Sequence, residues 1–411
     1  MTNKFLCGII QHIYFLLHNF RRISIMSKKI IALVLAMLMV VSIFAACGSK
    51  DPATDGEGTI KIGLSGPLTG AAAVYGVAVK NAAEMAAEEI NADGGMNGIN
   101  IEILATDDAH DPAKVSTNYY NMVGEGMQVS LGCVTSNPCL EFCKLSAEDN
   151  VFFLTPSASN DDVPAADNAY QMCFADGNQG GVAANTVNNL GLTKIGIFYK
   201  SDDSYSNGIY EQFKANLNEG IETVEAVFTS ANETDFSTQI SSLKDCEFIF
   251  MPIYYTPASL FMTQAKDTMA ANTVYFGCDG FDGIESAEGF DITTIPQKVT
   301  MLSHFNSKAT EGMAADFIAK YTDKYGADTL NQFGASAYDC VYALVAAMEK
   351  AIENGKTVDA STSASDLCDI LKEVFQGGFT FAGVTGESIT WDESGYVAKD
   401  AIQYVIKEAN A

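Results

Sequence analysis

Residues 59–90 read TIKIGLSGPLTGAAAVYGVAVKNAAEMAAEEI, and this stretch decides the fold class. Thr59 to Gly63 has the composition of a short apolar strand, and a turn rich in glycine and proline follows it. The alanine-rich sequence beyond the turn predicts a helix from about Ala78 to Ile90. The same order then repeats, because residues 99–106 read as a strand and residues 112–123 as a helix with proline in its first turn.

Further β-rich runs alternate with helical stretches along the rest of the chain. They cover residues 129–132, 151–154, 194–199, 247–253, 274–277 and 299–302. Strands that alternate with helices of ten or more residues are typical of parallel sheets covered on both faces. The sequence therefore predicts an α/β fold with more strands than one small sheet uses, and 411 residues suffice for two or three domain-sized units.

Composition narrows the range of partners. The chain has 51 acidic and 24 basic residues, a formal net charge of −27, and 48% hydrophobic residues. Nucleic acid is excluded as an expected partner, because phosphate neutralisation needs clustered Lys and Arg. The acidity is interpreted as a soluble surface that resists non-specific association.

The N-terminal region has the pattern of an export signal. Lys28 and Lys29 precede an apolar run from Ile30 to Phe44, which is shorter than the roughly 20 residues a bilayer crossing needs. Small residues and Cys47 follow, and this segment resembles the bacterial lipobox, so residues 26–47 are predicted to be a lipoprotein signal peptide with Cys47 lipidated. The alternative is an ordinary cleaved signal with an incidental cysteine. The polar residues 48–58 are predicted to be a tether.

Residues 1–25 precede the signal and are interpreted as an extension from a start codon placed too early, with Met26 as the true start. A second, short membrane segment is the alternative. Eight cysteines follow Cys47, and Cys133, Cys139, Cys143 and Cys173 are the one plausible local cluster. The spacing leaves disulfides and buried free thiols equally open.

Signatures of catalysis are scarce in this sequence. It has no nucleophile elbow, no phosphate loop and no dinucleotide fingerprint, and its four histidines lack metal-binding spacing. We therefore expect no enzymatic activity, no cofactor and no metal. Three connections stand out instead, at residues 64–76, 132–138 and 155–160, because they follow strands and contain glycine or hydroxyl-bearing residues. Hydroxyls and backbone N–H groups at helix starts suit a carboxylate ligand.

From residue 59 to the C-terminus the chain resembles the type I periplasmic binding proteins of the leucine/isoleucine/valine transport family. The motifs that carry this resemblance, in order, are IGLSGPLTG (62–70), AAEEINADGG (86–95), TDDAHDP (106–112), TPSASN (155–160), ETDFSTQI (233–240) and GCDGFDG (277–283). The resemblance implies two doubly wound parallel-sheet lobes joined by a three-stranded hinge. It places the first lobe at residues 59–175 and 303–386 and the second at 176–302 and 387–411.

The resemblance also implies a function. The chain would be a monomeric extracytoplasmic solute-binding protein, anchored by lipid to the outer face of the cell membrane. It would deliver a free amino acid, branched-chain or otherwise aliphatic, to the permease and ATPase subunits of an ABC importer. An amide, urea or a small carboxylate is the alternative ligand within the same fold, and a ligand-sensing module is the alternative role.

The family's site transfers to this chain residue by residue. Ser136, Ser157, Ala158 and Ser159 would receive the α-carboxylate of the ligand, and Asp279 would receive its ammonium. The aromatic positions of the family correspond to Tyr75, Tyr205 and one of Tyr254 and Tyr255, with the choice between the last two left open. Asp202, Asp203 and Asp282 are expected to be helix-cap or loop acids.

Overall fold

The computed structural model describes residues 58–410. The predicted extension 1–25, the signal peptide 26–47 with Cys47 and the tether up to residue 57 lie outside the described residues. None of the helices within residues 58–410 combines the length and apolarity that a bilayer crossing requires.

The first of two large sheets has five parallel strands in the order β2-β1-β3-β4-β5. The strands are β1 (Thr59–Gly66), β2 (Asn100–Asp107), β3 (Val129–Cys133), β4 (Phe153–Thr155) and β5 (Ala169–Gln171). Alternate residues of β1, such as Ile60, Ile62 and Leu64, are fully buried. All five strands end at the same edge of the sheet, and the connections that leave this edge carry several of the predicted site residues.

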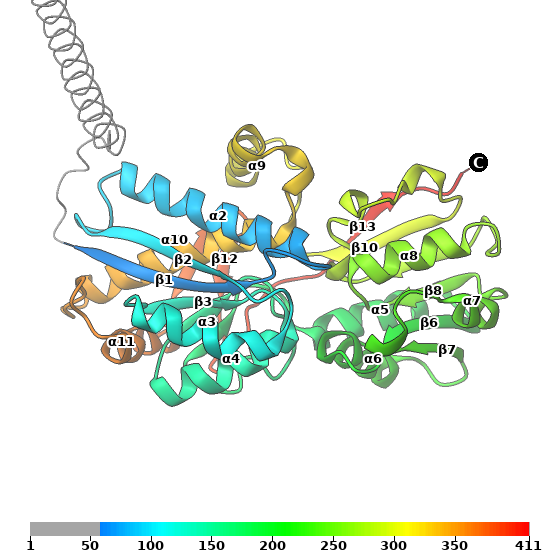
Figure 1. The fold of residues 1–411 in the computed structure, drawn as a ribbon, viewed down its shortest axis with the longest axis horizontal. Helices are drawn as coiled ribbons and strands as arrows, with labels where there is room; N and C mark the ends of the chain where they lie inside the picture. The colour runs from blue at the N-terminus through cyan, green and yellow to red at the C-terminus, as the bar shows by residue number, and fades with distance from the viewer. Residues whose placement is uncertain (1–57, 411) are drawn as a thin grey trace, which may run out of the picture. The chain divides into compact units, whose positions relative to one another are not determined.

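Helices cover both faces of this sheet (Figure 1), with α2 on one side and α3 and α4 on the other. The helices of this part are α2 (Ala73–Ala92), α3 (Pro112–Gly124), α4 (Ser136–Asp149), α9 (Gly312–Tyr325), α10 (Gln332–Glu353) and α11 (Ala364–Gln376). α10 lies against α2, so distant parts of the sequence share one hydrophobic core. We call this part the first lobe.

The second sheet has six strands in the order β13-β10-β9-β8-β6-β7. They are β6 (Lys194–Lys200), β7 (Glu222–Phe228), β8 (Phe248–Met251), β9 (Val274–Gly277), β10 (Lys298–Ser303) and β13 (Ile402–Lys407). With α5 (Asp176–Leu190), α6 (Ser204–Asn216), α7 (Ser237–Leu243) and α8 (Tyr255–Ala265) they form the second lobe. β13 runs antiparallel to β10, so the sheet is mixed rather than wholly parallel as predicted.

The chain passes between the two lobes three times. It leaves β5 for α5, leaves β10 for α9, and runs from the hairpin of β11 (Thr380–Gly383) and β12 (Gly386–Thr390) to β13. The predicted two-lobed α/β fold is therefore present, whereas the exact lobe boundaries remain a prediction.

Two differences from the sequence-based expectation have physical causes. α2 begins at Ala73 rather than near Ala78, because Tyr75 and Gly76 are buried in its first turn and tertiary packing outweighs the turn-like composition of this segment. Strands β5, β7, β11, β12 and β13 were not predicted, because they are short or only partly buried and polar residues interrupt their apolar positions. The eight cysteines of the described part are free thiols, and all except the half-buried Cys143 are buried, so the disulfide alternative is not realised there.

Candidate ligand-binding site

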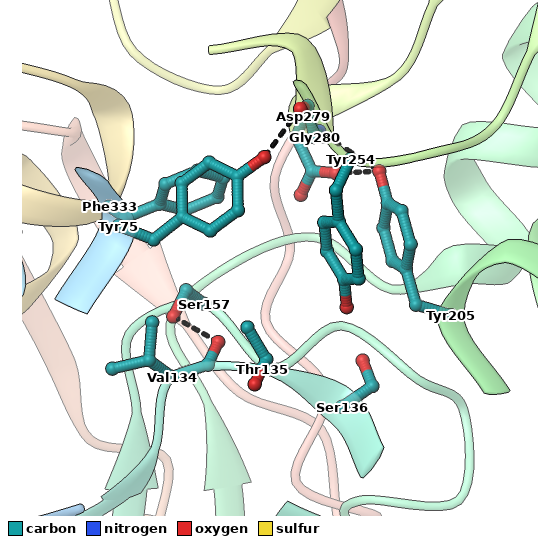
Figure 2. A pocket seen from close by; sticks show the side chains of 10 residues that line it. All are labelled: Tyr75, Val134, Thr135, Ser136, Ser157, Tyr205, Tyr254, Asp279, Gly280 and Phe333. Carbon is teal, nitrogen blue, oxygen red and sulfur yellow. Dashed lines mark hydrogen bonds between the residues drawn. The ribbon is translucent and has the colours of Figure 1, made fainter. Parts of the chain in front are cut away.

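A pocket of about 250 Å³ lies between the lobes, and residues of both lobes line it (Figure 2). Its lining residues are Tyr75, Val134, Thr135, Ser136, Ser157, Tyr205, Tyr254, Asp279, Gly280 and Phe333. Most of them follow the carboxyl ends of strands, which is where ligands bind in open α/β sheets. This volume includes space that is open to solvent, and the part enclosed by the lining side chains is small.

The first lobe supplies the hydroxyl-rich side of the pocket. Ser136 is the first residue of α4, and the preceding Thr135 makes no side-chain cap, so N–H groups at this helix start are left for another acceptor. The hydroxyl of Ser157 donates to the carbonyl oxygen of Val134 at 2.6 Å. The hydroxyl of Ser136 accepts from the backbone N–H of Asn160 at 3.3 Å, which fixes its position beside the pocket.

The second lobe supplies Asp279, in the short helical turn after β9, which is the one acidic side chain among the described residues that line the pocket. Its carboxylate accepts from the hydroxyl of Tyr205 at 2.7 Å, and its backbone N–H donates to Oε1 of Gln179 at 3.0 Å. Burial raises the pKa of Asp279 to about 7, and the hydrogen bond that its carboxylate accepts from Tyr205 only partly opposes this rise. The site thus holds one carboxylate that is poised to ionise near neutral pH.

Aromatic rings form the walls between these two polar ends. Figure 2 shows Tyr75 and Phe333 on one side and the stacked rings of Tyr205 and Tyr254 on the other. The centroids of Tyr205 and Tyr254 are 4.6 Å apart with the planes 11° from parallel, and Phe333 meets Tyr75 edge to face at 5.0 Å. Within residues 58–410, none of the residues that line this pocket is Lys or Arg. The site therefore suits a small ligand with an apolar middle, a cationic end and an end that accepts hydrogen bonds.

The structure separates the two tyrosines that the sequence left undecided. Tyr254 lines the pocket, and its hydroxyl has no hydrogen-bond partner among the described residues. Tyr255 belongs to α8, where its backbone N–H donates to the hydroxyl of Tyr75 at 3.2 Å and its ring packs edge to face on Tyr75. Tyr255 therefore supports a wall of the pocket instead of lining it.

Ala158 and Ser159, the other two predicted residues, are buried behind the lining. The carbonyl oxygen of Ala158 accepts from Nε2 of Gln171 at 2.8 Å, and Ser159 accepts from the backbone N–H of Asp176 through its carbonyl at 2.7 Å. Sequence reasoning missed Val134, Thr135, Gly280 and Phe333. The first three are neighbours of predicted residues, whereas Phe333 follows the helix-capping Asn331 far along the chain and carries no local signal.

The two lobes are in direct contact around this pocket. The hydroxyl of Tyr75 donates to the carbonyl of Gly280, which joins the first lobe to the second. Nδ2 of Asn137 donates to Asp203 at 2.9 Å, and Oδ1 of Asn137 accepts from the N–H of Ser204 at 3.1 Å. Asp203 also caps α6 through the N–H of Ser206, which confirms its predicted role as a capping acid. The arrangement is a closed one, in which both ends of the site are present together.

His110 lies beside the pocket without lining it. Its Nδ1 is 2.8 Å from the hydroxyl oxygen of Thr135, and its ring meets Tyr254 edge to face. Its Nε2 is 3.7 Å from Asp203 of the other lobe. No group of His, Cys, Asp and Glu side chains within residues 58–410 has the arrangement of a metal site.

Two parallel-sheet lobes that close on a pocket with polar ends and aromatic walls define a solute-binding protein. The chain belongs to the periplasmic binding protein family, whose sequence profile matches residues 59–407. This family consists of extracytoplasmic binding proteins, and the resemblance to the leucine/isoleucine/valine branch inferred from the motifs is confirmed.

Two relatives illustrate the similarity. A Leu/Ile/Val-binding protein of Rhizobium johnstonii is 33% identical over 322 residues, which cover 75% of this chain and 83% of the relative. A leucine-, isoleucine-, valine-, threonine- and alanine-binding protein of Pseudomonas aeruginosa is 27% identical over 333 residues, 78% of this chain and 85% of that protein.

Solved structures agree on the fold. A leucine-binding protein of Thermotoga maritima superposes with a TM-score of 0.73 at 23% identity, over 85% of this chain and 95% of that one. A solute-binding protein of R. palustris in complex with benzoate has a TM-score of 0.72 at 17% identity, over 85% of this chain and 93% of that one. Because this fold accepts ligands as different as leucine and benzoate, the ligand must be argued from the site.

Proposed function

We propose that the protein binds a free aliphatic amino acid between its lobes and delivers it to an ABC importer. The observation that carries this proposal is the buried carboxylate of Asp279 opposite the hydroxyl and N–H groups around Ser136 and Ser157. A zwitterion needs an anion at one end and donors at the other, because a charged group that is desolvated without a partner costs several kcal/mol.

The walls of the pocket favour an apolar ligand side chain. Tyr75, Val134 and Phe333 offer ring faces and methyl groups to such a side chain. The names of the relatives, which mention leucine, isoleucine, valine, threonine and alanine, agree with this range of ligands. A benzoate-like ligand fits less well, since an aromatic carboxylate would leave Asp279 buried without a cation.

Closure of the two lobes would couple binding to delivery. In an open state Asp279 and Ser136, which belong to different lobes, would separate, so only the closed state satisfies both ends of a zwitterion. We take the lobes as residues 59–175 with 303–386 and residues 176–302 with 387–411. The permease and ATPase subunits would recognise the closed form, because hinge closure around a ligand is the working motion of periplasmic binding proteins.

A lipid anchor on Cys47 would hold the protein at the outer face of the cell membrane, as a monomer without catalytic activity. The support for the anchor is the signal-like sequence 26–47 that ends at this cysteine. Lipid chains contribute about 0.8 kcal/mol per buried CH₂, so more than one chain gives stable anchoring.

The decisive experiment is calorimetric titration of the chain from residue 48 onward, which contains the whole compact unit of residues 56–411. The panel contains the twenty amino acids, urea, acetamide, acetate and benzoate. We expect saturable binding, at a dissociation constant of micromolar or lower, from one or a few aliphatic amino acids. Binding of benzoate, acetate or an amide, with no signal from any amino acid, would refute the proposed ligand class.

A further inference from the structure

A second pocket between the lobes shares one lining residue, Tyr254, with the proposed ligand site. Its volume is about 440 Å³, part of which is open to solvent, against about 250 Å³ for the ligand pocket. Ala72 and His110 line it from the first lobe, whereas Lys200 and Glu233 line it from the second. The site as described so far uses only the smaller of these two neighbouring spaces.

The side chain of Tyr254 forms the partition between the two pockets. Figure 2 shows its ring between those of Tyr75 and Tyr205, whose centroids lie 5.8 Å and 4.6 Å from it. His110, which lines the second pocket, meets the same ring edge to face at 5.3 Å. The buried hydroxyl of Tyr254 has no hydrogen-bond partner among the described residues, so ring packing holds this side chain in place. A turn of the Tyr254 side chain about χ1 would join the two pockets.

The second pocket combines apolar walls with one ion pair. Ala72, Phe228 and Ile253 are buried and supply methyl groups and a ring. Lys200 and Glu233 form the ion pair. An ammonium and a carboxylate held together present a donor and an acceptor side by side. That combination matches a carboxamide or a ureido group, each of which has both N–H donors and a carbonyl acceptor.

The other charged or titratable side chains of this lining also have partners. Asp203 accepts from the backbone N–H of Ser206 at 3.0 Å and from Nδ2 of Asn137 at 2.9 Å. Nδ1 of His110 is 2.8 Å from the hydroxyl oxygen of Thr135. A ligand group with a full charge would have to break one of these pairings and leave a protein charge without its partner, which is costly in a partly buried site. The lining therefore favours a polar group without charge.

We propose that this second pocket is a subsite for the side chain of the bound amino acid. It receives the distal group of side chains longer than that of leucine, once Tyr254 turns aside. The group that it favours is uncharged and has both a donor and an acceptor, as in glutamine and citrulline. This inference rests on the proposed function and extends its ligand class from aliphatic side chains to long, neutral polar ones. Lys200 and Glu233 are then specificity-determining residues.

Two pairs of ligands of matched shape test this subsite by calorimetric titration of the chain from residue 48 onward. Glutamine and glutamate differ by a charge at the distal group, and so do citrulline and arginine. Leucine is the reference ligand, and norleucine supplies a long side chain without a polar end. In wild type we expect glutamine to bind at least about tenfold more tightly than glutamate, and citrulline to exceed arginine by a similar factor.

Variants of the ion pair should shift this preference in opposite directions. Glu233→Gln leaves Lys200 without its anion, so the affinity for glutamate should rise to within about threefold of that for glutamine. Lys200→Met leaves Glu233 without its cation, so arginine should gain on citrulline by a similar factor. The matched control is Glu225→Gln, because Glu225 pairs with Lys214 at 3.0 Å in the same lobe but lines neither pocket. This control should keep the wild-type preferences.

The partition gives an independent readout. Tyr254→Ala opens one pocket to the other, so it should weaken the binding of leucine more than that of citrulline. An equal loss for both ligands would refute the passage of the side chain beyond Tyr254.

The inference is overturned if wild type binds leucine but none of glutamine, citrulline and norleucine. It is also overturned if the neutral and charged members of each pair bind equally well. Changes of the same sign in Glu233→Gln and Lys200→Met, together with a lower melting temperature, would assign the ion pair a structural role and refute the subsite. A wild type that binds no amino acid at all refutes the proposed function itself, whereas binding of leucine without any distinction within the pairs refutes this inference alone.

Discussion

The affinity for an amino acid should depend on pH through Asp279. Burial raises the pKa of this carboxyl to about 7 in the ligand-free protein, so it is neutral in acid and ionised above neutrality. Because an ammonium group binds the carboxylate and not the carboxylic acid, affinity must rise with pH. At about pH 5.5 only about one molecule in 30 carries the ionised form, against about nine in ten at pH 8, so affinity should fall about 30-fold on going from pH 8 to pH 5.5.

The assay is calorimetric titration at several pH values, with the melting temperature measured at each to confirm that the protein stays folded. His110 would change the affinity in the opposite direction. Its protonation in acid would strengthen its pairing with Asp203 across the lobes and so favour the closed state. Burial lowers the pKa of this histidine. Asp203 is itself buried with a raised pKa, and Lys200, Glu233 and Asp111 also act on His110. A His110→Gln variant removes the histidine contribution. The role of Asp279 would be refuted if the dissociation constant of this variant changed less than about twofold between pH 8 and pH 5.5, or if binding became tighter in acid.

Three further predictions concern single residues. Asp279→Ala should weaken amino-acid binding at least about 100-fold, because the ammonium group of the ligand loses its partner, while circular dichroism should show an intact fold. Unchanged affinity would remove Asp279 from the site. The control is Asp202→Asn, because the Asp202 carboxylate accepts from the backbone N–H of Ser230 in an exposed loop. Tyr254→Ala should cost about tenfold or more in affinity by the same titration, since it removes the ring stacked on Tyr205, and an unaltered affinity would exclude Tyr254 from the wall. Cys47→Ser should move the protein from the membrane pellet to the soluble fraction after cell fractionation, and continued pelleting would argue against the lipid anchor.

The fold was largely predictable because its signals are local. Fully buried parallel strands such as β6 are continuous apolar runs, and the alternation of such strands with helices defines the α/β class. The edge strands β7 and β13 escaped prediction because they are only partly buried and polar residues, such as Glu222 and Glu225 in β7 and Gln403 in β13, interrupt their apolar positions. The antiparallel direction of β13 depends on the path of the last inter-lobe connection, which leaves no pattern in the sequence.

The site was predictable to the extent that loops after strands carry it. Ser136, Ser157 and Asp279 lie in such loops and line one pocket, as the motifs suggested. Phe333 could not be found in this way. Phe333 reaches the pocket because α10 packs against α2, and no local pattern marks this packing in the sequence.

The contacts between the lobes also bear on how tightly any ligand is held. Tyr75 and Asn137 make hydrogen bonds to the opposite lobe that involve no ligand atom. Such contacts stabilise the closed state in its own right, and the measured affinity is the intrinsic affinity of the closed state reduced by the fraction of molecules that are closed. Replacing Asn137 would therefore weaken binding without touching the ligand, by an amount set by the lost closure energy. Substitutions in the pocket and at the lobe contacts should then combine additively where they lie far apart, and a departure from additivity would measure how strongly closure and ligand recognition are coupled.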